Sequence, residues 1–205
     1  MRIKKSIFIL FVFGIPFLLG TGLVGYWYWT TRLEKKALLP TFGKVPEFSL
    51  TSEDNRNITH RDFLGKVSIV DFVFTQCGGA CPMMSAKMSE LQQVFSSDPR
   101  IQFISFSVDP ETDSPSVLQE YANQYHAIQG KWIFLTGDKN QIYQLTKEGF
   151  HLGLDIEGND AIIHSQKFVL VDHHRAIRGY YDSDDEEAMK NLLRDTKILS
   201  GKIYP

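Results

Sequence analysis

Cysteine is scarce in this sequence: 205 residues contain two, Cys77 and Cys81. Two thiolates are too few to close a structural zinc site, so any metal held by them needs a further ligand. Basic residues are not in excess either. The part of the chain from Arg32 onward has 19 basic and 24 acidic residues, a net charge of −5, which argues against nucleic acid as a partner. The chain also has no internal repeat and no low-complexity segment.

Charge is absent from Ser6 to Thr31. At 1.5 Å rise per residue, a helix from Ser6 to Trp29 is long enough to cross a bilayer core of about 30 Å. A secretory signal has a shorter apolar region of about 7–15 residues and a small-residue cleavage site. Here the run ends in four aromatic residues, 26–29, of the kind that lie at the lipid–water boundary. We expect an uncleaved anchor over residues 1–31, with a cleaved signal peptide as the alternative.

Basic residues flank this run, three on each side: Arg2, Lys4, Lys5 and Arg32, Lys35, Lys36. The first three favour a cytoplasmic N-terminus, and the second three weaken that preference without reversing it. We therefore expect a single-pass protein of the cytoplasmic (inner) membrane, with its bulk on the periplasmic or extracytoplasmic side, where disulfides can persist. Residues 32–40 are a short tether, and 41–205 are long enough for one core.

Strands and helices alternate along this domain. β-branched and aromatic runs predict strands at 66–74, 101–108 and 132–137 and a hairpin over 165–182. Helical spacing and capping residues predict helices over 82–95, 114–126, 138–150 and 186–199. The alternation suggests an α/β fold with a largely parallel sheet, covered on both faces and made mixed by the hairpin. An acidic cluster at 182–187 suits the start of the last helix, and a metal-binding acidic patch is the alternative.

The cysteines flank the loop between a predicted strand and a predicted helix. Ligands in open α/β sheets bind at the carboxyl ends of strands, and a helix N-terminus favours thiolate over thiol. Gly78 and Gly79 lack a Cβ, so the loop can bring both sulfurs to one point. The alternative is two structural cysteines that form a static disulfide or pack as small hydrophobic side chains. A disulfide that closes so short a loop gains little from chain entropy.

Paired thiolates are soft ligands that select copper(I), zinc or iron–sulfur clusters. The chain offers six histidines: His60, His126, His151, His164, His173 and His174. His164 differs from the rest because it immediately precedes a strongly apolar strand, and in a thioredoxin-like arrangement that loop faces the cysteine loop. His173 and His174 fall in the predicted hairpin turn, and we expect them to be remote from the cysteines and solvent-facing.

Three blocks occur in order behind the anchor: VDFVFTQCGGACP, SFSVDPETDSP and KWIFLTG, followed by the histidine before an apolar strand. In this set the chain resembles the SCO/SenC family of copper-binding assembly proteins for cytochrome c oxidase, over most of residues 43–195. The resemblance implies a thioredoxin-like α/β fold, a central mixed sheet flanked by helices. It also implies copper, as Cu(I) or Cu(II), bound by Cys77, Cys81 and His164.

The same resemblance implies a chaperone rather than an enzyme. Its partners would be the copper-bearing oxidase subunit and other periplasmic copper chaperones, and Cys77 and Cys81 would form a redox disulfide. It would deliver copper to the dinuclear copper centre of the oxidase, or keep the cysteines of that centre reduced as thiols. This chain departs from the family pattern at residues 78–80, which are smaller than usual, and at Ile163, where Asp is common and Asp160 lies further back. These departures concern copper affinity and choice of target more than the ligand set.

A membrane-tethered thiol–disulfide oxidoreductase, which keeps partner cysteines reduced, is the competing class. Such proteins mostly use Cys-x-x-Cys and resemble thioredoxin in a cis-proline facing the cysteines, whereas this chain has no proline between Pro115 and Pro205. A histidine in that region favours metal instead. A peroxiredoxin-like enzyme would need a Pro-x-x-x-Thr-x-x-Cys arrangement, which is absent around Cys77. An interaction module without chemistry would leave the paired thiols unexplained.

Overall fold

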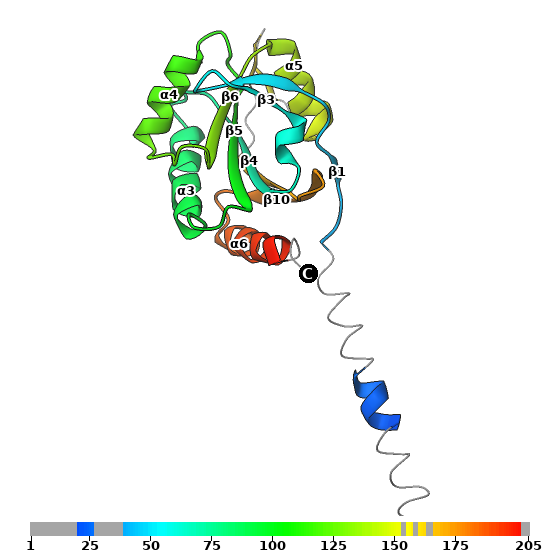
Figure 1. The fold of residues 1–205 in the computed structure, drawn as a ribbon. Coiled ribbons are helices and arrows are strands. Elements are labelled where there is room, and N and C mark those ends of the chain that lie inside the picture. Colours follow the sequence, from blue (N-terminus) through cyan, green and yellow to red (C-terminus); the bar gives the residue numbers. More distant parts are fainter. Residues whose placement is uncertain (1–19, 27–38, 153–154, 158–159, 163–165, 202–205) are drawn as a thin grey trace, which may run out of the picture. The chain divides into compact units, whose positions relative to one another are not determined.

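The computed structural model describes residues 20–26, 39–152, 155–157, 160–162 and 166–201 (Figure 1). The chain divides into two units, Met1–Leu39 and Pro40–Pro205. In the first unit, residues 20–26 are helical. Within the described ranges, no helix has both the length and the apolar character needed to cross a bilayer. Most of the expected anchor lies outside these ranges, so the anchor stays a prediction.

An eight-stranded mixed sheet forms the centre of the second unit, in the order β1-β10-β9-β4-β5-β6-β2-β3 (Figure 1). β4 pairs in parallel with β5, and β5 with β6, while the other neighbours in this sheet are antiparallel. β7 and β8 form a separate hairpin. The strands are β1 (Gly43–Lys44), β2 (Ser49–Ser52), β3 (Asn57–Thr59), β4 (Val67–Val73), β5 (Ile101–Ser107), β6 (Trp132–Thr136), β7 (Asp155–Glu157), β8 (Asp160–Ile162), β9 (Lys167–Val171) and β10 (Ala176–Asp182).

The prediction of a largely parallel sheet is wrong. Three short strands, β1 to β3, precede the first predicted strand, and β1 and β2 add antiparallel pairs beside β10 and β6. They are two to four residues long, too short to show the period-2 pattern by which a strand is recognised. The expected thioredoxin-like architecture, a central mixed sheet flanked by helices, is confirmed.

Helices cover both faces of the sheet (Figure 1). The predicted caps are confirmed: Ser114 Oγ accepts the N–H of Val117 at 3.4 Å, and Asp138 Oδ1 accepts the N–H of Gln141 at 2.8 Å. Each cap satisfies a backbone donor that the first helical turn leaves unpaired. The helices are η2 (3-10, His60–Phe63), α3 (Ala80–Val94), α4 (Pro115–Gln124), α5 (Lys139–Gln144), η3 (π-helical, Leu145–Gly149) and α6 (Glu186–Gly201).

Stacked aromatic rings fill the core beneath α5. Phe72 of β4 and Phe106 of β5 stack with centroids 5.2 Å apart, and the ring of Phe150 contacts them at 5.2 and 5.6 Å. All seven residues of β4 are buried, and so are all seven of β5. Burying one phenylalanine stabilises a fold by roughly 1.5–3 kcal/mol, so this cluster fixes the two central strands firmly.

The topology brings the start of β9 to the same end of the strands as the end of β4. We call this end of the sheet, at which the parallel strands finish, its carboxyl edge. β4, β5 and β6 are parallel, so their carboxyl ends lie at one edge. β9 runs antiparallel to β4, with Val169 opposite Val70, and its first residue is therefore at that same edge. The chain leaves β4 and enters β9 on one side of the molecule, which is where α/β sheets place their binding sites.

Candidate functional site

Both cysteines lie just beyond the carboxyl end of β4, as predicted. The N–H of Cys77 donates to the carbonyl of Phe74 at 3.3 Å and closes a tight turn, after which α3 begins. Cys81 was expected before the helix but lies inside its first turn. Pro82 need not be the first residue of the helix. The first turn tolerates proline, because the backbone N–H groups of that turn have no intrahelical partner and the missing N–H of proline costs no hydrogen bond. Both thiols are free, and they hydrogen-bond to each other.

The Cys77 thiol has a lowered pKa although it is partly buried. Burial raises the pKa, but hydrogen bonds to the sulfur lower the pKa by more than burial raises it. The donors are the backbone N–H and thiol of Cys81 and the backbone N–H groups of Gly79 and Ala80. These donors lie at the start of α3, where unpaired N–H groups and the helix dipole favour negative charge. Cys77 is therefore the sulfur that becomes a thiolate more readily, as its position before a helix predicted.

The Cys81 thiol differs from its neighbour in exposure and in pKa. It is 6% exposed. Burial raises its pKa to about 12, helped by the hydrogen bond to Cys77 and by negative charge on Cys77 and Asp71, against a partial offset from the backbone of Phe74. The site therefore holds one accessible sulfur that ionises readily and one sheltered sulfur that keeps its proton.

The third expected ligand, His164, lies outside the described residues. It precedes β9 by a few residues, and β9 begins at the edge of the sheet that carries the cysteine loop. Within the described part of the chain, no group of three or more His, Cys, Asp or Glu side chains is arranged to hold a metal ion. The assignment of His164 to the site thus stays a prediction.

Two other histidines are remote from the thiols, as expected. His173 and His174 lie in the turn between β9 and β10, at the opposite edge of the sheet, with ring centroids 4.0 Å apart. His174 is exposed, but His173 is only partly exposed and its Nδ1 is buried, so the prediction that both face solvent is correct for His174 alone.

The acidic cluster at 182–187 begins a helix, as predicted. Asp185 Oδ1 accepts the backbone N–H of Glu187 at 2.8 Å and that of Ala188 at 3.3 Å. Carboxylates in this position pair with the free N–H groups of the first turn and favour the positive end of the helix dipole. The capping interpretation therefore accounts for the cluster.

Two buried carboxyl groups near the cysteine loop were not predicted from the sequence. Asp71 lies in the middle of β4 and accepts a 2.5 Å hydrogen bond from Ser105 Oγ. Asp113 lies in the loop between β5 and α4 and accepts hydrogen bonds from Thr75. Asp71 could have been identified as the one acidic residue within the run 66–74. Nothing local could have linked Asp113 with Thr75, 38 residues away.

The residues between the cysteines add no side chain over the Cys77 sulfur. Among the described residues, a Cβ added at Gly78 would meet nothing within 4 Å, and a Cβ added at Gly79 would lie 3.9 Å from Cys77 Sγ, an ordinary van der Waals contact. A side chain at position 78 would thus project into open space above the loop. With two glycines and an alanine, the loop adds almost no bulk around the thiols.

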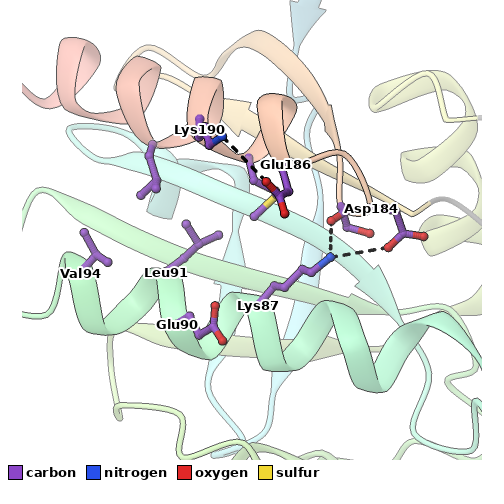
Figure 2. A pocket seen from close by; sticks show the side chains of 10 residues that line it. Lys87, Glu90, Leu91, Val94, Asp184, Glu186 and Lys190 are labelled. Carbon is purple, nitrogen blue, oxygen red and sulfur yellow. Dashed lines mark hydrogen bonds and ion pairs between the residues drawn. The ribbon is translucent and has the colours of Figure 1, made fainter.

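Helix α3 also borders a groove along its later turns. The groove, of about 320 Å³, runs between α3 and α6 and has apolar side chains at its base and charged ones at its rim (Figure 2). Lys87 closes one end, where it donates to the carbonyl of Ser183 and pairs with Asp184 at 3.6 Å. Neither cysteine lines this groove, so it is separate from the thiol site.

Comparison with known proteins gives the family. The SCO1/SenC family model matches residues 38–197. A SCO1 protein homolog of Bacillus subtilis (strain 168) is 31% identical to this chain over 160 residues, which cover 77% of this chain and 83% of the relative.

Solved structures agree with the family match. BsSco, described as a member of the Sco family of cytochrome c oxidase assembly proteins with a disulfide switch, is 28% identical with a TM-score of 0.70, over 80% of this chain and 98% of that one. ScoI of Bradyrhizobium japonicum with copper bound is 23% identical with a TM-score of 0.62, over 74% of this chain and 99% of that one, a likeness of fold. The match spans most of the chain, and the chain belongs to the SCO1/SenC family.

Proposed function

We propose that this chain is a membrane-anchored copper chaperone, which carries copper on Cys77, Cys81 and His164 and supports metallation of the dinuclear copper centre of cytochrome c oxidase. The observation that carries the proposal is the pair of free, inequivalent thiols at the carboxyl edge of β4. The family adds support, since BsSco belongs to the oxidase assembly proteins and the ScoI structure contains copper.

The chemistry of the donors suits copper as cargo. Thiolate sulfur is soft and selects copper(I), and imidazole is a common copper ligand. Cys77 supplies the sulfur that ionises readily, while Cys81 must release its proton when copper binds, because only the thiolate is a ligand. The N–H groups at the start of α3 stabilise the negative charge that two thiolates bring to a single copper ion.

The N-terminal segment gives this carrier its location. An anchor over residues 1–31 would place the domain on the extracytoplasmic side of the cytoplasmic membrane. The tether, residues 32–40, has few residues, and an extended chain reaches at most about 3.3–3.6 Å per residue, so the tether cannot extend far from the membrane. The thiols would then stay close to the membrane in which the oxidase lies, and other periplasmic copper chaperones could load them there.

Reduction of a partner's disulfide, which keeps partner cysteines reduced, is the second candidate function. It is favoured by the hydrogen bond between the two sulfurs and by the division between an accessible Cys77 and a sheltered Cys81. An exposed thiolate can attack a partner disulfide, and a second thiol nearby can release the partner by closing a disulfide. In this function Cys77 and Cys81 are both needed, and His164 is not.

Copper titration of the full-length protein in detergent tests the proposal. Under anaerobic, reducing conditions, copper(I) would be competed against a chromophoric chelator for the wild type and for His164→Ala. His174→Ala is the matched control, because it removes an exposed imidazole from the opposite edge of the sheet. We expect one copper ion per chain, at least about tenfold weaker binding and an altered copper(II) spectrum for His164→Ala, and no change for the control.

Each result separates the two functions. Equal affinity and identical spectra for the two histidine variants would remove His164 from the site. A His164→Ala protein that loses copper but still reduces a test disulfide at the wild-type rate would show that copper binding and thiol reduction depend on different residues. A wild type that binds no copper and reduces the disulfide would favour the reductase.

A further inference from the structure

Asp113 connects the cysteine loop to the neighbouring strand. Its carboxylate is fully buried and accepts hydrogen bonds from three donor groups, one of which, the Thr75 N–H, is shared between both oxygens. The backbone N–H of Thr75 donates to Oδ2 at 3.2 Å, the hydroxyl of Thr75 donates to Oδ1 at 2.5 Å, and the hydroxyl of Ser107 donates to Oδ2 at 2.6 Å. A buried carboxylate with this many donors is well satisfied, and charge-assisted hydrogen bonds of this kind are stronger than neutral ones.

The backbone around Asp113 is fixed independently of the thiols. Its N–H donates to the carbonyl of Asp109 at 2.9 Å, and the next residue, Ser114, is the N-cap of α4. On the other side of the carboxylate, Ser107 is the last residue of β5. The carboxylate is thus held by the end of a central strand and the start of a helix, and it can act as a rigid point for a less regular segment.

Thr75 belongs to that less regular segment. Strand β4 ends at Val73, whose carbonyl accepts the N–H of Val108 at 2.9 Å as a last link to the β5 side. The turn that follows, from Phe74 to Cys77, contains Thr75 as its second residue. Two hydrogen bonds to one carboxylate fix both the backbone and the side chain of Thr75. The position of the turn, and with it the position of Cys77, follows from them.

We propose that Asp113 is a positioning residue for the thiol site: through Thr75 it holds the Phe74–Cys77 turn so that the Cys77 sulfur stays over the start of α3 and beside the Cys81 sulfur. The inference rests on the proposed function for its effect on copper, and on the geometry alone for its effect on the thiols. It also connects two segments that are far apart in the sequence. TQC, residues 75–77, contains the Cys77 sulfur, and SVDPETD, residues 107–113, contains the carboxylate that positions this sulfur.

Substitutions at Thr75 test this in the full-length protein. Thr75→Val removes the 2.5 Å hydroxyl bond and keeps the backbone donor, and Thr75→Ser keeps both. Ser52→Ala is a control for the loss of a buried hydroxyl that bonds a carboxylate. Ser52 Oγ donates to Asp54 at 2.5 Å and accepts the N–H of Arg56 at 3.0 Å, and Ser52 lies in β2, three strands away from β4. Asp113→Ala removes the bonds from all three donor groups, and Asp113→Asn keeps one acceptor oxygen for Thr75.

Two measurements are made on each variant: copper(I) affinity with the copper(II) spectrum, and the equilibrium constant for reduction of the Cys77–Cys81 disulfide by glutathione. We expect Thr75→Val and Asp113→Ala to bind copper about 10–100-fold more weakly, the usual effect of losing a group that orients a ligand. Their disulfide should also be reduced about tenfold more readily, because two loosely held thiols have a lower effective concentration. Thr75→Ser should match the wild type, and Asp113→Asn should fall between the wild type and Asp113→Ala.

The outcomes distinguish this inference from the proposed function. If Thr75→Val shows wild-type affinity, spectrum and disulfide equilibrium, Asp113 does not position the thiols. If Ser52→Ala changes them as much as Thr75→Val does, the effect is one of general stability, and the inference is also wrong. If the wild type binds no copper, the proposed function fails, while the disulfide equilibrium still decides the role of Asp113. Should Asp113→Ala not fold, the Thr75 pair alone decides it.

Discussion

Ser105 Oγ lies 2.5 Å from Asp71 Oδ1 and donates a hydrogen bond to it between the two central strands of the sheet. Ser105 Oγ in turn accepts the indole N–H of Trp132 at 2.8 Å, while the second oxygen of Asp71 has no hydrogen-bond partner among the described residues. The carboxyl is fully buried beside the helix that carries Cys81. A charge at this point is poorly compensated, and this has a measurable effect on stability.

Asp71→Asn should change how the stability of the protein depends on pH. Burial raises the pKa of Asp71 from 3.8 to about 7, although the Ser105 hydrogen bond lowers it. The folded chain keeps a proton that the unfolded chain releases, so stability falls as pH rises from about 4 to 7. Between pH 5 and pH 8 this group alone should remove about 3 kcal/mol.

Urea unfolding of both proteins at pH 5 and pH 8 measures that slope. Asp71→Asn should lose about 3 kcal/mol less than the wild type over this interval. Asp138→Asn is the control, because Asp138 is an N-cap and asparagine caps a helix as well as aspartate does. This variant should show the wild-type dependence of stability on pH. Parallel pH profiles for wild type and Asp71→Asn would mean that Asp71 is ionised in the folded protein throughout.

Alkylation should distinguish the two thiols. At pH 7.5, iodoacetamide should modify Cys77 at least about tenfold faster than Cys81, because thiolate fraction and access control the rate. Both cysteines lie in one tryptic peptide, residues 67–87, so fragment ions are needed to locate the label. Comparable labelling of both positions at early times, or faster labelling of Cys81, would contradict the assignment of Cys77 as the more acidic thiol.

Oxidation of the thiols should prevent copper binding. A disulfide between Cys77 and Cys81 offers no thiolate, so the oxidised protein should bind copper(I) far more weakly than the dithiol. The protein would be oxidised, its loss of thiols confirmed by alkylation, and copper(I) then titrated without a reductant. Renewed reduction should restore binding and serves as the control. Binding of the oxidised form with the affinity of the dithiol would refute the role of the sulfurs as ligands.

Removal of the N-terminal segment should affect the place of action and leave the chemistry intact. A version that begins at Pro40 should bind copper with wild-type affinity, because the removed residues 1–39 contain no cysteine and no histidine. Exported without its anchor at matched abundance, it should support less oxidase activity, since tethering raises the effective concentration near a membrane partner. Full restoration of oxidase activity by the untethered form would show that the anchor does not act through local concentration.

Local chemistry allowed most of the fold to be predicted. Ser114 and Asp138 identify helix starts because a cap acts on N–H groups two or three residues ahead, within the range that a sequence pattern shows. The short strands β1 and β2 depend instead on pairing with the distant strands β10 and β6, and β3 in turn pairs only with β2 in this sheet. Pairing partners of that kind leave little trace in a stretch of two to four residues.

The same division applies to the site. Cys77 and Cys81 could be predicted from spacing, since a strand, two glycines and a helix start are adjacent in the chain. The contact between Thr75 and Asp113 could not, because it depends on how the loops after β4 and β5 meet across the parallel strand pair. The inequivalence of the thiols also required the structure, since it follows from the burial of Cys81 in the first turn of α3.

The open space above Gly78 has a consequence for the choice of partner. Recognition distinguishes one protein from another partly by steric exclusion, and a bulky side chain next to a reactive atom is the simplest means of excluding the wrong one. Among the residues that the structure describes, a side chain added at position 78 would meet nothing within 4 Å, so the residues between the cysteines exclude very little. Any partner whose own surface can reach the Cys77 sulfur gains access to it. Discrimination among partners must therefore come from surfaces that surround the cysteine loop, and an arginine or a tryptophan introduced at position 78 should make the thiol site more selective than it now is.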